Sequence, residues 1–246
     1  MSCSKIYNKH KNKLHTFPCS APKRLTKIER SNIKINSPLD EIIIGLLLGD
    51  GHLQSRNGNS RFIYAQSSLR ENHLNYFYHV YSMFKPFLSK EFEAKSRSFL
   101  DNRTNKTYSS ISFATLSLPC FNLYRSLFYN EKNKKFVPSN INQLLTPRGL
   151  AYWIMDDGSL HNKGLHLSTY SFSYKDVILL QNTIINLFMP NFTVKCTIHN
   201  HQKGYRLYIW KESMDLIRNQ IYEYMHKDML YKIKTPVIGP NAECDA

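Results

Sequence analysis

Two aspartates, Asp50 and Asp157, each follow an apolar run and stand directly before a glycine. The runs, residues 43–51 and 150–158, are apolar almost all round, which is typical of buried helices. If the two helices pack side by side, both carboxylates meet at their carboxyl ends, where the helix dipoles are already negative. Such a pair is favourable when a cation binds there, and an all-oxygen set suits a hard divalent ion. The spacing therefore predicts a metal site shared by two halves of the chain.

The two runs share the same start signal. Ser37 and Pro38 precede the first run, and Thr146 and Pro147 precede the second. A hydroxyl N-cap followed by proline at the first helical position is a typical helix start. Small residues such as Gly45 would let the two backbones approach closely. An ordinary pair of buried helices with acidic ends is the alternative, and the duplication argues against it.

The chain repeats the same order of expected elements after each apolar helix. In the first half we expect hairpins over 52–66 and 92–115 and helices over 70–88 and 118–129. In the second half we expect hairpins over 159–170 and 192–210 and helices over 174–188 and 211–225. This order predicts an α+β fold of two pseudo-symmetric αββαββα modules, each with a curved antiparallel four-stranded sheet, joined through the paired helices. The expected boundaries are a basic, flexible extension over 1–36, module one over 37–131, a linker over 132–145, module two over 146–235 and a tail over 236–246.

The composition points to a polyanionic partner. Lys and Arg number 33 against 18 Asp and Glu, which gives a net charge of +15. Such an excess on a globular chain most often indicates nucleic acid, and a merely soluble basic surface is the alternative. The five scattered cysteines are typical of free thiols in a reducing compartment. No run of about 18 apolar residues is present, so we expect no membrane partner.

Alternation along the expected strands gives each sheet one apolar face and one polar, basic face. A two-stranded surface of this kind fits the major groove of DNA, and an ordinary solvated face would need less positive charge. The candidate DNA-contacting residues of the polar faces are Gln54, Arg56, Arg61, Lys95, Arg97, Tyr108 and Ser110 in module one, and His161, Lys163, His166, Lys195, Thr197, His199, Arg206 and Tyr208 in module two. Gln54 with His161, and Arg56 with Lys163, lie at equal distances beyond the two aspartates and would make equivalent contacts in two half-sites.

The two apolar runs resemble the paired motifs of LAGLIDADG homing endonucleases in their monomeric, two-motif form. Residues 150–158, which read LAYWIMDDG, are especially similar to the intron-encoded mitochondrial enzymes of yeast type. The resemblance covers about residues 38–235, and the pair of motifs at this spacing is far more specific than the first motif alone. It implies a site-specific DNA endonuclease that makes a metal-dependent double-strand break by phosphodiester hydrolysis and so promotes intron mobility. It also implies a monomer, a long pseudo-palindromic or asymmetric duplex target, and a mitochondrial location, with a plastid as the alternative.

The resemblance assigns roles to the two motif ends. Asp50 and Asp157 would ligate Mg²⁺ ions shared between them, assisted by the backbone carbonyls of Gly49 and Asp156. The side chain of Asp156 lies one residue earlier on its helix, and we expect it to point elsewhere in a structural or supporting role.

The resemblance also assigns two lysines. Lys135 and Lys232 stand in matching places after the last helix of each module, where a lysine would reach the active-site water and the scissile phosphate. A surface phosphate contact is the alternative role for either lysine. If the register is shifted, the candidates are instead Lys134, Lys227 and Lys234.

Gln66 matches a polar position that lines the metal pocket of the family and is a further catalytic candidate. Its counterpart in module two is expected to be Tyr170, a departure from the usual small amide, so the two half-sites would not be cut with equal efficiency. The His199-Asn200-His201 stretch looks like a fragment of another nuclease motif, but the remaining ligands are absent, and we interpret it as a loop that contacts DNA.

Two other functions stay open. An RNA maturase that assists splicing of its own group I intron would use the same fold and the same basic faces. A DNA-binding regulator that does not cut would keep the scaffold alone. The intact Asp50 and Asp157 argue against the regulator, because binding by itself requires neither acid.

Overall fold

The computed structural model describes residues 25–89 and 93–234, which fall into two halves of the same build. Module one contains α2 (Leu39–Leu48), β1 (His52–Arg56), β2 (Asn59–Ser67), α3 (Glu71–Phe84), β3 (Lys95–Asp101), β4 (Lys106–Ala114) and α4 (Asn122–Phe128). Module two contains α6 (Pro147–Asp157), β5 (Gly158–His161), β6 (Gly164–Ser168), α7 (Tyr174–Asn186), β7 (Cys196–His201), β8 (Gly204–Ile209) and α8 (Met214–Ile221). The predicted duplicated α+β fold is therefore confirmed, and the expectations for residues 1–24 and for the tail lie outside the described residues.

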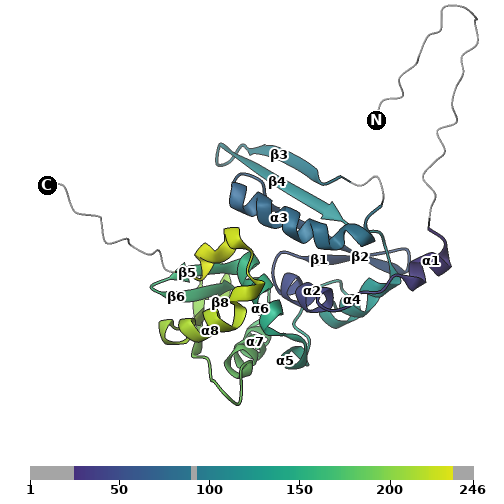
Figure 1. Ribbon diagram of the computed structural model, residues 1–246. Coiled ribbons are helices and arrows are strands. Elements are labelled where there is room, and N and C mark those ends of the chain that lie inside the picture. The colour runs from purple at the N-terminus through teal and green to yellow at the C-terminus, as the bar shows by residue number, and fades with distance from the viewer. Residues whose placement is uncertain (1–24, 90–92, 235–246) are drawn as a thin grey trace, which may run out of the picture.

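Each module has one antiparallel four-stranded sheet. The strand orders are β1-β2-β4-β3 and β5-β6-β8-β7, so the second strand of each first hairpin pairs with the second strand of the second hairpin. The two modules lie on opposite sides of α2 and α6, which meet in the middle of the molecule (Figure 1). No helix in the described ranges is long and apolar enough to cross a bilayer.

Helices α2 and α6 pack closely enough for their backbones to touch. A methyl group added at Gly45 would lie 2.1 Å from the carbonyl oxygen of Gly149, so only glycine fits at this crossing. Seven consecutive residues of α2, positions 42–48, are buried. This burial explains why the sequence of α2 is apolar all round, because one side of the helix faces α6 and the other faces its own sheet.

Helix α3 covers the inner face of the first sheet through aromatic contacts. Phe84 stacks on Phe62 with ring centroids 4.5 Å apart, and Phe77 meets Phe113 edge-on at 5.7 Å. All four rings are fully or almost fully buried. The aromatic stripe of this helix is therefore core, as its helical spacing suggested.

The two helix starts differ from one another. Thr146 caps α6 as predicted, since its hydroxyl accepts a hydrogen bond from the backbone N–H of Gly149 at 3.1 Å. Ser37, in contrast, is not the N-cap of α2. The helix begins at Leu39 with Pro38 in the cap position, and the Ser37 hydroxyl instead donates to Glu41 at 3.2 Å. The common start signal was thus correct for only one of the two helices.

Two segments expected to lack structure contain helices. Residues 25–36 include α1 (Lys27–Asn32), so a flexible extension to residue 36 is wrong for this part. A capping box stabilises α1, because Thr26 and Glu29 satisfy each other's backbone N–H groups. The predicted linker over 132–145 contains the short helix α5 (Ile141–Leu144) near its end. Both helices are shorter than two turns, which explains why the sequence shows no helical hydrophobic periodicity there.

Two predicted sheet positions are wrong in detail. Strand β7 begins at Cys196, so Lys195 precedes the strand that was expected to start near residue 192. Lys163 lies in the turn between β5 and β6 with φ of 65°, whereas Arg56 belongs to β1. The expected equivalence of Arg56 and Lys163 therefore fails, because the first hairpin of module two is shorter than that of module one.

Candidate active site

The ends of α2 and α6 bring the two motif acids together. Helix α2 ends at Leu48, which leaves Asp50 just beyond it, while Asp157 is the last residue of α6. The backbone N–H of Asp50 donates to a carboxylate oxygen of Asp156 at 3.0 Å. Gly49 leaves room for this contact, since a methyl group there would lie 2.6 Å from the Asp156 side chain. The predicted convergence of the two motif ends is thus present in the structure.

The side chain of Asp156 points into module one and not toward solvent. Its second carboxylate oxygen accepts a hydrogen bond from the Tyr64 hydroxyl at 2.7 Å. Burial, and then the nearby charge of Asp50, raise the pKa of Asp156 well above its ordinary value. Asp156 therefore joins the two modules beneath the site, which agrees with a supporting role for its side chain.

Gln66 contacts the motif acid of its own module. Its amide nitrogen donates to the Asp50 carboxylate at 2.6 Å and to the Tyr64 hydroxyl at 2.9 Å. Gln66 and Tyr64 both lie on the inner face of β2, two residues apart, and both are buried. Tyr64 was missed by the sequence reasoning, although the period of two along a strand places it beside Gln66.

Lys135 and Lys232 each reach the carbonyl oxygens at the end of the motif helix in their own module. The Lys135 ammonium donates to Gly51 O at 2.8 Å and to Gly49 O at 3.4 Å. The Lys232 ammonium donates to Asp156 O at 2.8 Å and also to Met155 O. These lysines, and not their neighbours, lie at the site: the register alternatives Lys134, Lys227 and Lys234 are exposed.

Burial dominates the electrostatics of the site. It lowers the pKa of Lys135 to about 8 and also lowers that of Lys232, although the nearby aspartates oppose both shifts. Burial raises the pKa of Asp157 to about 7, with a further contribution from Asp50. The carboxyl of Asp50 has its pKa raised by the same loss of solvent, against the hydrogen bond from Gln66 and the two lysines.

The donor set fits a hard divalent cation. Within the described residues, the carboxylate of Asp157 has no hydrogen-bonding partner, and it lies close enough to Asp50 for their charges to repel. Carboxylates and carbonyl oxygens are the ligands that Mg²⁺ and Ca²⁺ prefer, and a bound cation would relieve this repulsion. No group of three or more His, Cys, Asp or Glu side chains in the described ranges could hold a metal, so backbone carbonyls or water must complete the coordination.

The two modules differ at the position of Gln66. His52 pairs with Ile63 and Ser159 pairs with His166, each two residues beyond its motif acid. Ile63 and His166 therefore occupy equivalent positions. The residue three positions beyond each of them is Gln66 in module one and Thr169 in module two. The counterpart of Gln66 is therefore Thr169, and the expected counterpart Tyr170 is wrong.

Thr169 and Tyr170 point away from any role like that of Gln66. The Thr169 hydroxyl donates to the backbone carbonyl of Tyr205 at 2.7 Å. Tyr170 lies on the other face, where its ring stacks on His201 at 4.8 Å. Module two thus has no side-chain amide at this strand position.

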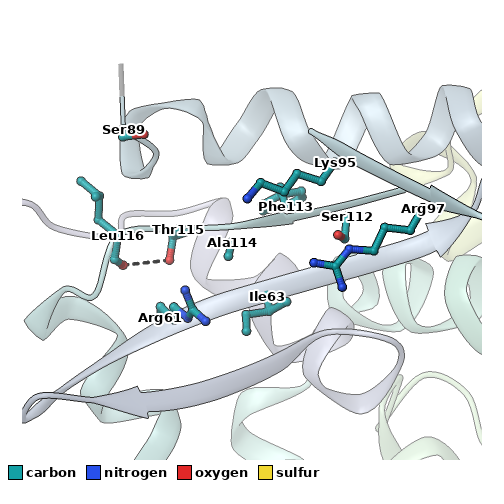
Figure 2. Close-up of a pocket in the computed structure, with 10 residues that line it drawn as sticks. All are labelled: Arg61, Ile63, Ser89, Lys95, Arg97, Ser112, Phe113, Ala114, Thr115 and Leu116. Carbon is teal, nitrogen blue, oxygen red and sulfur yellow. Dashed lines mark hydrogen bonds between the residues drawn. The ribbon is translucent and has the colours of Figure 1, made fainter. Parts of the chain in front are cut away.

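The outer face of the first sheet carries a basic groove. Lys95, Arg97 and Arg61 line a hollow of about 500 Å³, together with Ile63 of β2 and Ser112 of β4 (Figure 2). Lys95 and Arg97 face Ser112 and Ser110 across the β3–β4 pair, as the alternation predicted. Arg61 is oriented by Gln54, whose side-chain oxygen accepts two hydrogen bonds from the guanidinium. At the far end of the sheet, Tyr108 stacks on Phe99 at 5.5 Å.

The outer face of the second sheet is rich in histidine. The His166 ring lies 4.8 Å from the rings of His161 and Tyr208 and 5.6 Å from that of His199. Burial lowers the pKa of His166 to about 4, with Arg206 as the next cause, so the ring is neutral at physiological pH. His166 is only 5% exposed and therefore supports its neighbours more than it offers an edge of its own.

Other candidates of this face are more open. His161 and Lys195 are exposed, and the Thr197 hydroxyl is shared between His199 and the Trp210 indole. Arg206 pairs with His199 across the sheet, and its buried Nε has no hydrogen-bond partner in the part of the chain that the structure describes.

Comparisons with known proteins agree with this geometry. A sequence model of the LAGLIDADG DNA endonuclease family matches residues 40–217. The cytochrome b mRNA maturase bI2 of Saccharomyces cerevisiae is 31% identical over 209 residues, which is 81% of this chain and 48% of the maturase. The DNA endonuclease I-ChuI of Chlamydomonas applanata is 30% identical over 203 residues, 78% of this chain and 93% of that enzyme. This chain thus spans about half of the yeast maturase and nearly all of the algal enzyme.

A solved structure shares the fold. The homing endonuclease I-WcaI, bound to its DNA recognition sequence, aligns with a TM-score of 0.74 and 20% sequence identity. The alignment covers 91% of this chain and 97% of that protein. Both modules and the paired helices between them are therefore shared with a protein that was solved on DNA.

Proposed function

This chain belongs to the LAGLIDADG DNA endonuclease family, and we propose that it is a site-specific homing endonuclease that cuts both strands of a DNA duplex. The observation that carries the proposal is the convergence of Asp50 and Asp157 beside two buried lysines. One acid and one lysine come from each module, so one catalytic set is available for each strand. The product would be a double-strand break that promotes movement of the intron encoding the protein.

The reaction is phosphodiester hydrolysis assisted by divalent metal, which we take to be Mg²⁺. The carboxylates of Asp50 and Asp157 would hold the ions, with the carbonyl oxygens of Gly49 and Asp156 as further ligands. When bound, the metal supplies Lewis-acid polarisation of the phosphate and lowers the pKa of a coordinated water. Gln66 orients the Asp50 carboxylate through its amide hydrogen bond.

Lys135 and Lys232 would stabilise the negative charge that develops on the phosphate. Their ammonium groups are held at the helix ends by carbonyl oxygens, beside the acids and without an ion-pair contact to them in the described residues. The lowered pKa of Lys135, about 8, also lets this residue exchange a proton near neutral pH. The sequence similarity and the placement support these roles.

The partner is double-stranded DNA with a long target, bound across both outer sheet faces. Arg61, Lys95 and Arg97 would contact one half-site, and His161, His199 and Arg206 the other. Because both modules are in one chain, the protein would act as a monomer on an asymmetric or pseudo-palindromic sequence. Relatives named for cytochrome b messenger RNA support an organellar location, which we take to be the mitochondrion, with the plastid as the alternative.

The test is cleavage of a plasmid that carries the host locus without its intron. The wild type should linearise the plasmid with Mg²⁺ and not with a chelator. Asp50→Asn and Asp157→Asn should each abolish double-strand cleavage while binding stays within about a few-fold, because each acid serves the metal and not a base. Asp215→Asn is the matched control, since this carboxylate is 90% exposed and far along the chain in α8. Normal cutting by either motif variant would contradict the assignment.

A second function has support from two relatives that are named maturases. The same basic faces could bind the folded RNA of the intron and assist its splicing. Splicing of the intron RNA in the presence of protein measures this activity directly. A maturase without endonuclease activity would splice and leave the plasmid intact.

A further inference from the structure

A chain of hydrogen-bond contacts runs from the second module to the catalytic amide of the first. The Tyr231 hydroxyl lies 3.2 Å from His73 Nε2, and His73 Nδ1 lies 3.4 Å from the side-chain oxygen of Gln66. The amide nitrogen of Gln66 then donates to Asp50 at 2.6 Å. His73 belongs to α3 of module one, whereas Tyr231 stands directly before Lys232 in the short helix Lys227–Lys232 of module two.

We propose that His73 and Tyr231 are positioning residues that fix the amide of Gln66 in the orientation that serves Asp50. The inference rests on the proposed endonuclease function, because its expected effect is on DNA cleavage. Within the described residues, the side chains of His73 and Tyr231 make no hydrogen bond to Asp50, Asp157, Lys135 or Lys232. The contact through which they reach the site is the one with Gln66.

The direction of every bond in this chain follows from the atoms involved. The amide oxygen of Gln66 can only accept, so His73 Nδ1 must carry a proton and donate. A neutral imidazole then has a bare Nε2, which must accept from the Tyr231 hydroxyl. The Asp50 carboxylate can only accept, so the Gln66 amide nitrogen must face it. All three donors point the same way, from the exposed Tyr231 toward Asp50.

The alternative orientation of the amide shows what His73 prevents. If Gln66 rotated by half a turn about its last bond, its oxygen would face the Asp50 carboxylate and its nitrogen would face a donor. Gln66 is 8% exposed, so water can offer little compensation. The His73 N–H is the donor that matches the amide oxygen, and it therefore selects the correct orientation.

A second contact holds the same two elements together. Asn75, two residues beyond His73 in α3, donates to the Asp228 carboxylate at 2.9 Å. Burial, and then nearby Lys232 and Arg70, lower the pKa of His73, which favours the neutral ring that the chain requires. The segment that carries Lys232 is thus joined to the amide that serves the other module's acid. Among the described residues, module two has no equivalent of this chain of contacts, because Thr169 stands where Gln66 stands in module one.

Because these contacts serve the acid of module one, the test compares the rates at which the two DNA strands are cut. A supercoiled plasmid or a duplex with a different dye on each strand reports the two strand cuts separately. Gln66→Leu identifies the strand that depends on Asp50. His73→Leu should slow the same strand by roughly tenfold, the cost of one hydrogen bond of about 1.4 kcal/mol, and nicked product should accumulate. The other strand should be cut at close to the wild-type rate.

A rescue variant distinguishes a positioning role of His73 from a role in packing. In His73→Asn the side-chain N–H₂ replaces Nδ1–H but cannot reach Tyr231, so this variant should recover most of the lost rate. Tyr231→Phe should give a smaller, strand-specific loss. His79→Asn is the control, because His79 lies in the same helix, is half-buried and bonds the Tyr152 hydroxyl instead of Gln66. Equal slowing of both strands by His73→Leu, or the same loss with His79→Asn, would overturn the proposal.

A spectroscopic measurement tests the contact without cleavage. Long-range ¹H–¹⁵N spectra of the metal-free protein should show His73 as the Nδ1–H tautomer, and Tyr231→Phe should shift its Nε2 resonance. A His73 ring protonated on Nε2 would refute the hydrogen-bond chain whatever the cleavage data. A wild-type protein that never cuts DNA, with the Nδ1–H tautomer present, would refute the function and leave the chain intact.

Discussion

Lys135 and Lys232 reach equivalent places from dissimilar segments. Lys135 lies in the linker and forms an isolated β-bridge with Tyr129, whereas Lys232 ends a short helix at the end of module two. Both ammonium groups bind the last carbonyls of a motif helix, where the negative end of the helix dipole favours a cation. The sequence could place both lysines because each follows its module's last helix and precedes a recognisable Pro-containing stretch.

Removal of either ammonium group should slow the reaction strongly. Lys135→Met and Lys232→Met keep the length of the side chain and should each reduce the cleavage rate by roughly 10²-fold, the scale of losing one electrostatic stabiliser. Single-turnover cleavage with saturating Mg²⁺ measures the effect. Lys134→Met and Lys234→Met are the matched controls, because both neighbours are exposed. A larger loss in either control would shift the register of the assignment by one or two residues.

The acid cluster predicts an unusual dependence of stability on pH in the absence of metal. The pKa of Asp157 is about 7 in the folded protein against an ordinary 3.8, so the folded state holds a proton that the unfolded chain has already released. The free energy of unfolding should therefore fall as pH rises from about 4 to 7. Urea unfolding in a chelator, followed by circular dichroism, measures this slope.

Two comparisons identify the source of that slope. Asp157→Asn should reduce the slope by removing one of the groups, while Asp50 and Asp156, whose pKa values are also raised, keep part of it. An excess of Mg²⁺ should also reduce it, by stabilising the charged carboxylates. Asp215→Asn should leave it unchanged. An unaltered slope in Asp157→Asn would show that other carboxylates cause the effect.

At the scale of elements, the sequence defined the repeating order well and the registers less well. Alternation placed Lys95 and Arg97 on the outer face, because side-chain direction in a strand depends only on parity. The expected counterpart of Gln66, Tyr170, was wrong by one residue, because the pairing of β5 with β6 places Thr169 at that position. Contacts such as that of His73 with Tyr231 depend on how α3 packs against module two. No local pattern contains that information.

The crossing of α2 and α6 gives the prediction at this scale. Gly45→Ala should destabilise the protein by about 1–3 kcal/mol or more, because the added methyl group would overlap the Gly149 carbonyl at 2.1 Å. The sign is informative, since alanine in place of glycine within a helix ordinarily stabilises by about 1 kcal/mol. Thermal and urea unfolding measure the change.

Gly149→Ala is the comparison for this crossing. A methyl group there would lie 3.1 Å from the Glu41 carbonyl oxygen, a tight contact that small movements can relieve. Its destabilisation should therefore be clearly smaller than that of Gly45→Ala. If Gly45→Ala cost no more stability than Gly149→Ala, the close contact of Gly45 with the Gly149 carbonyl would not limit the crossing.

At the scale of the whole molecule, the outer faces of the two sheets differ in chemistry. The first sheet presents Arg61, Lys95 and Arg97 around a groove, while the second presents histidines with Arg206 and Tyr208. Guanidinium and ammonium groups favour phosphates and guanine, whereas the two ring nitrogens of histidine can donate or accept hydrogen bonds at base edges. Unlike surfaces on a pseudo-symmetric frame fit an asymmetric target better than a perfect palindrome.

Selection of bound duplexes from a randomised DNA pool tests this surface and separates the endonuclease from the maturase. The wild type should enrich one long duplex sequence. Lys95→Ala, Arg97→Ala, Lys195→Ala and Arg206→Ala should each act in one of two ways. A phosphate contact, once lost, weakens binding to all sequences and lowers the salt dependence by about one ion. A base contact, once lost, relaxes specificity at one position at a cost of about 1–3 kcal/mol.

A control variant and a contrary outcome complete this selection experiment. Lys175→Ala, in α7 and away from the outer faces, should change neither the enriched sequence nor the salt dependence. A-form RNA hides its major groove from side chains, so a protein that binds only RNA would show no base-pair preference that maps to single sheet residues. If the wild type enriches no duplex but binds the folded intron RNA tightly, the basic faces serve splicing, and the acids at the ends of α2 and α6 need another explanation.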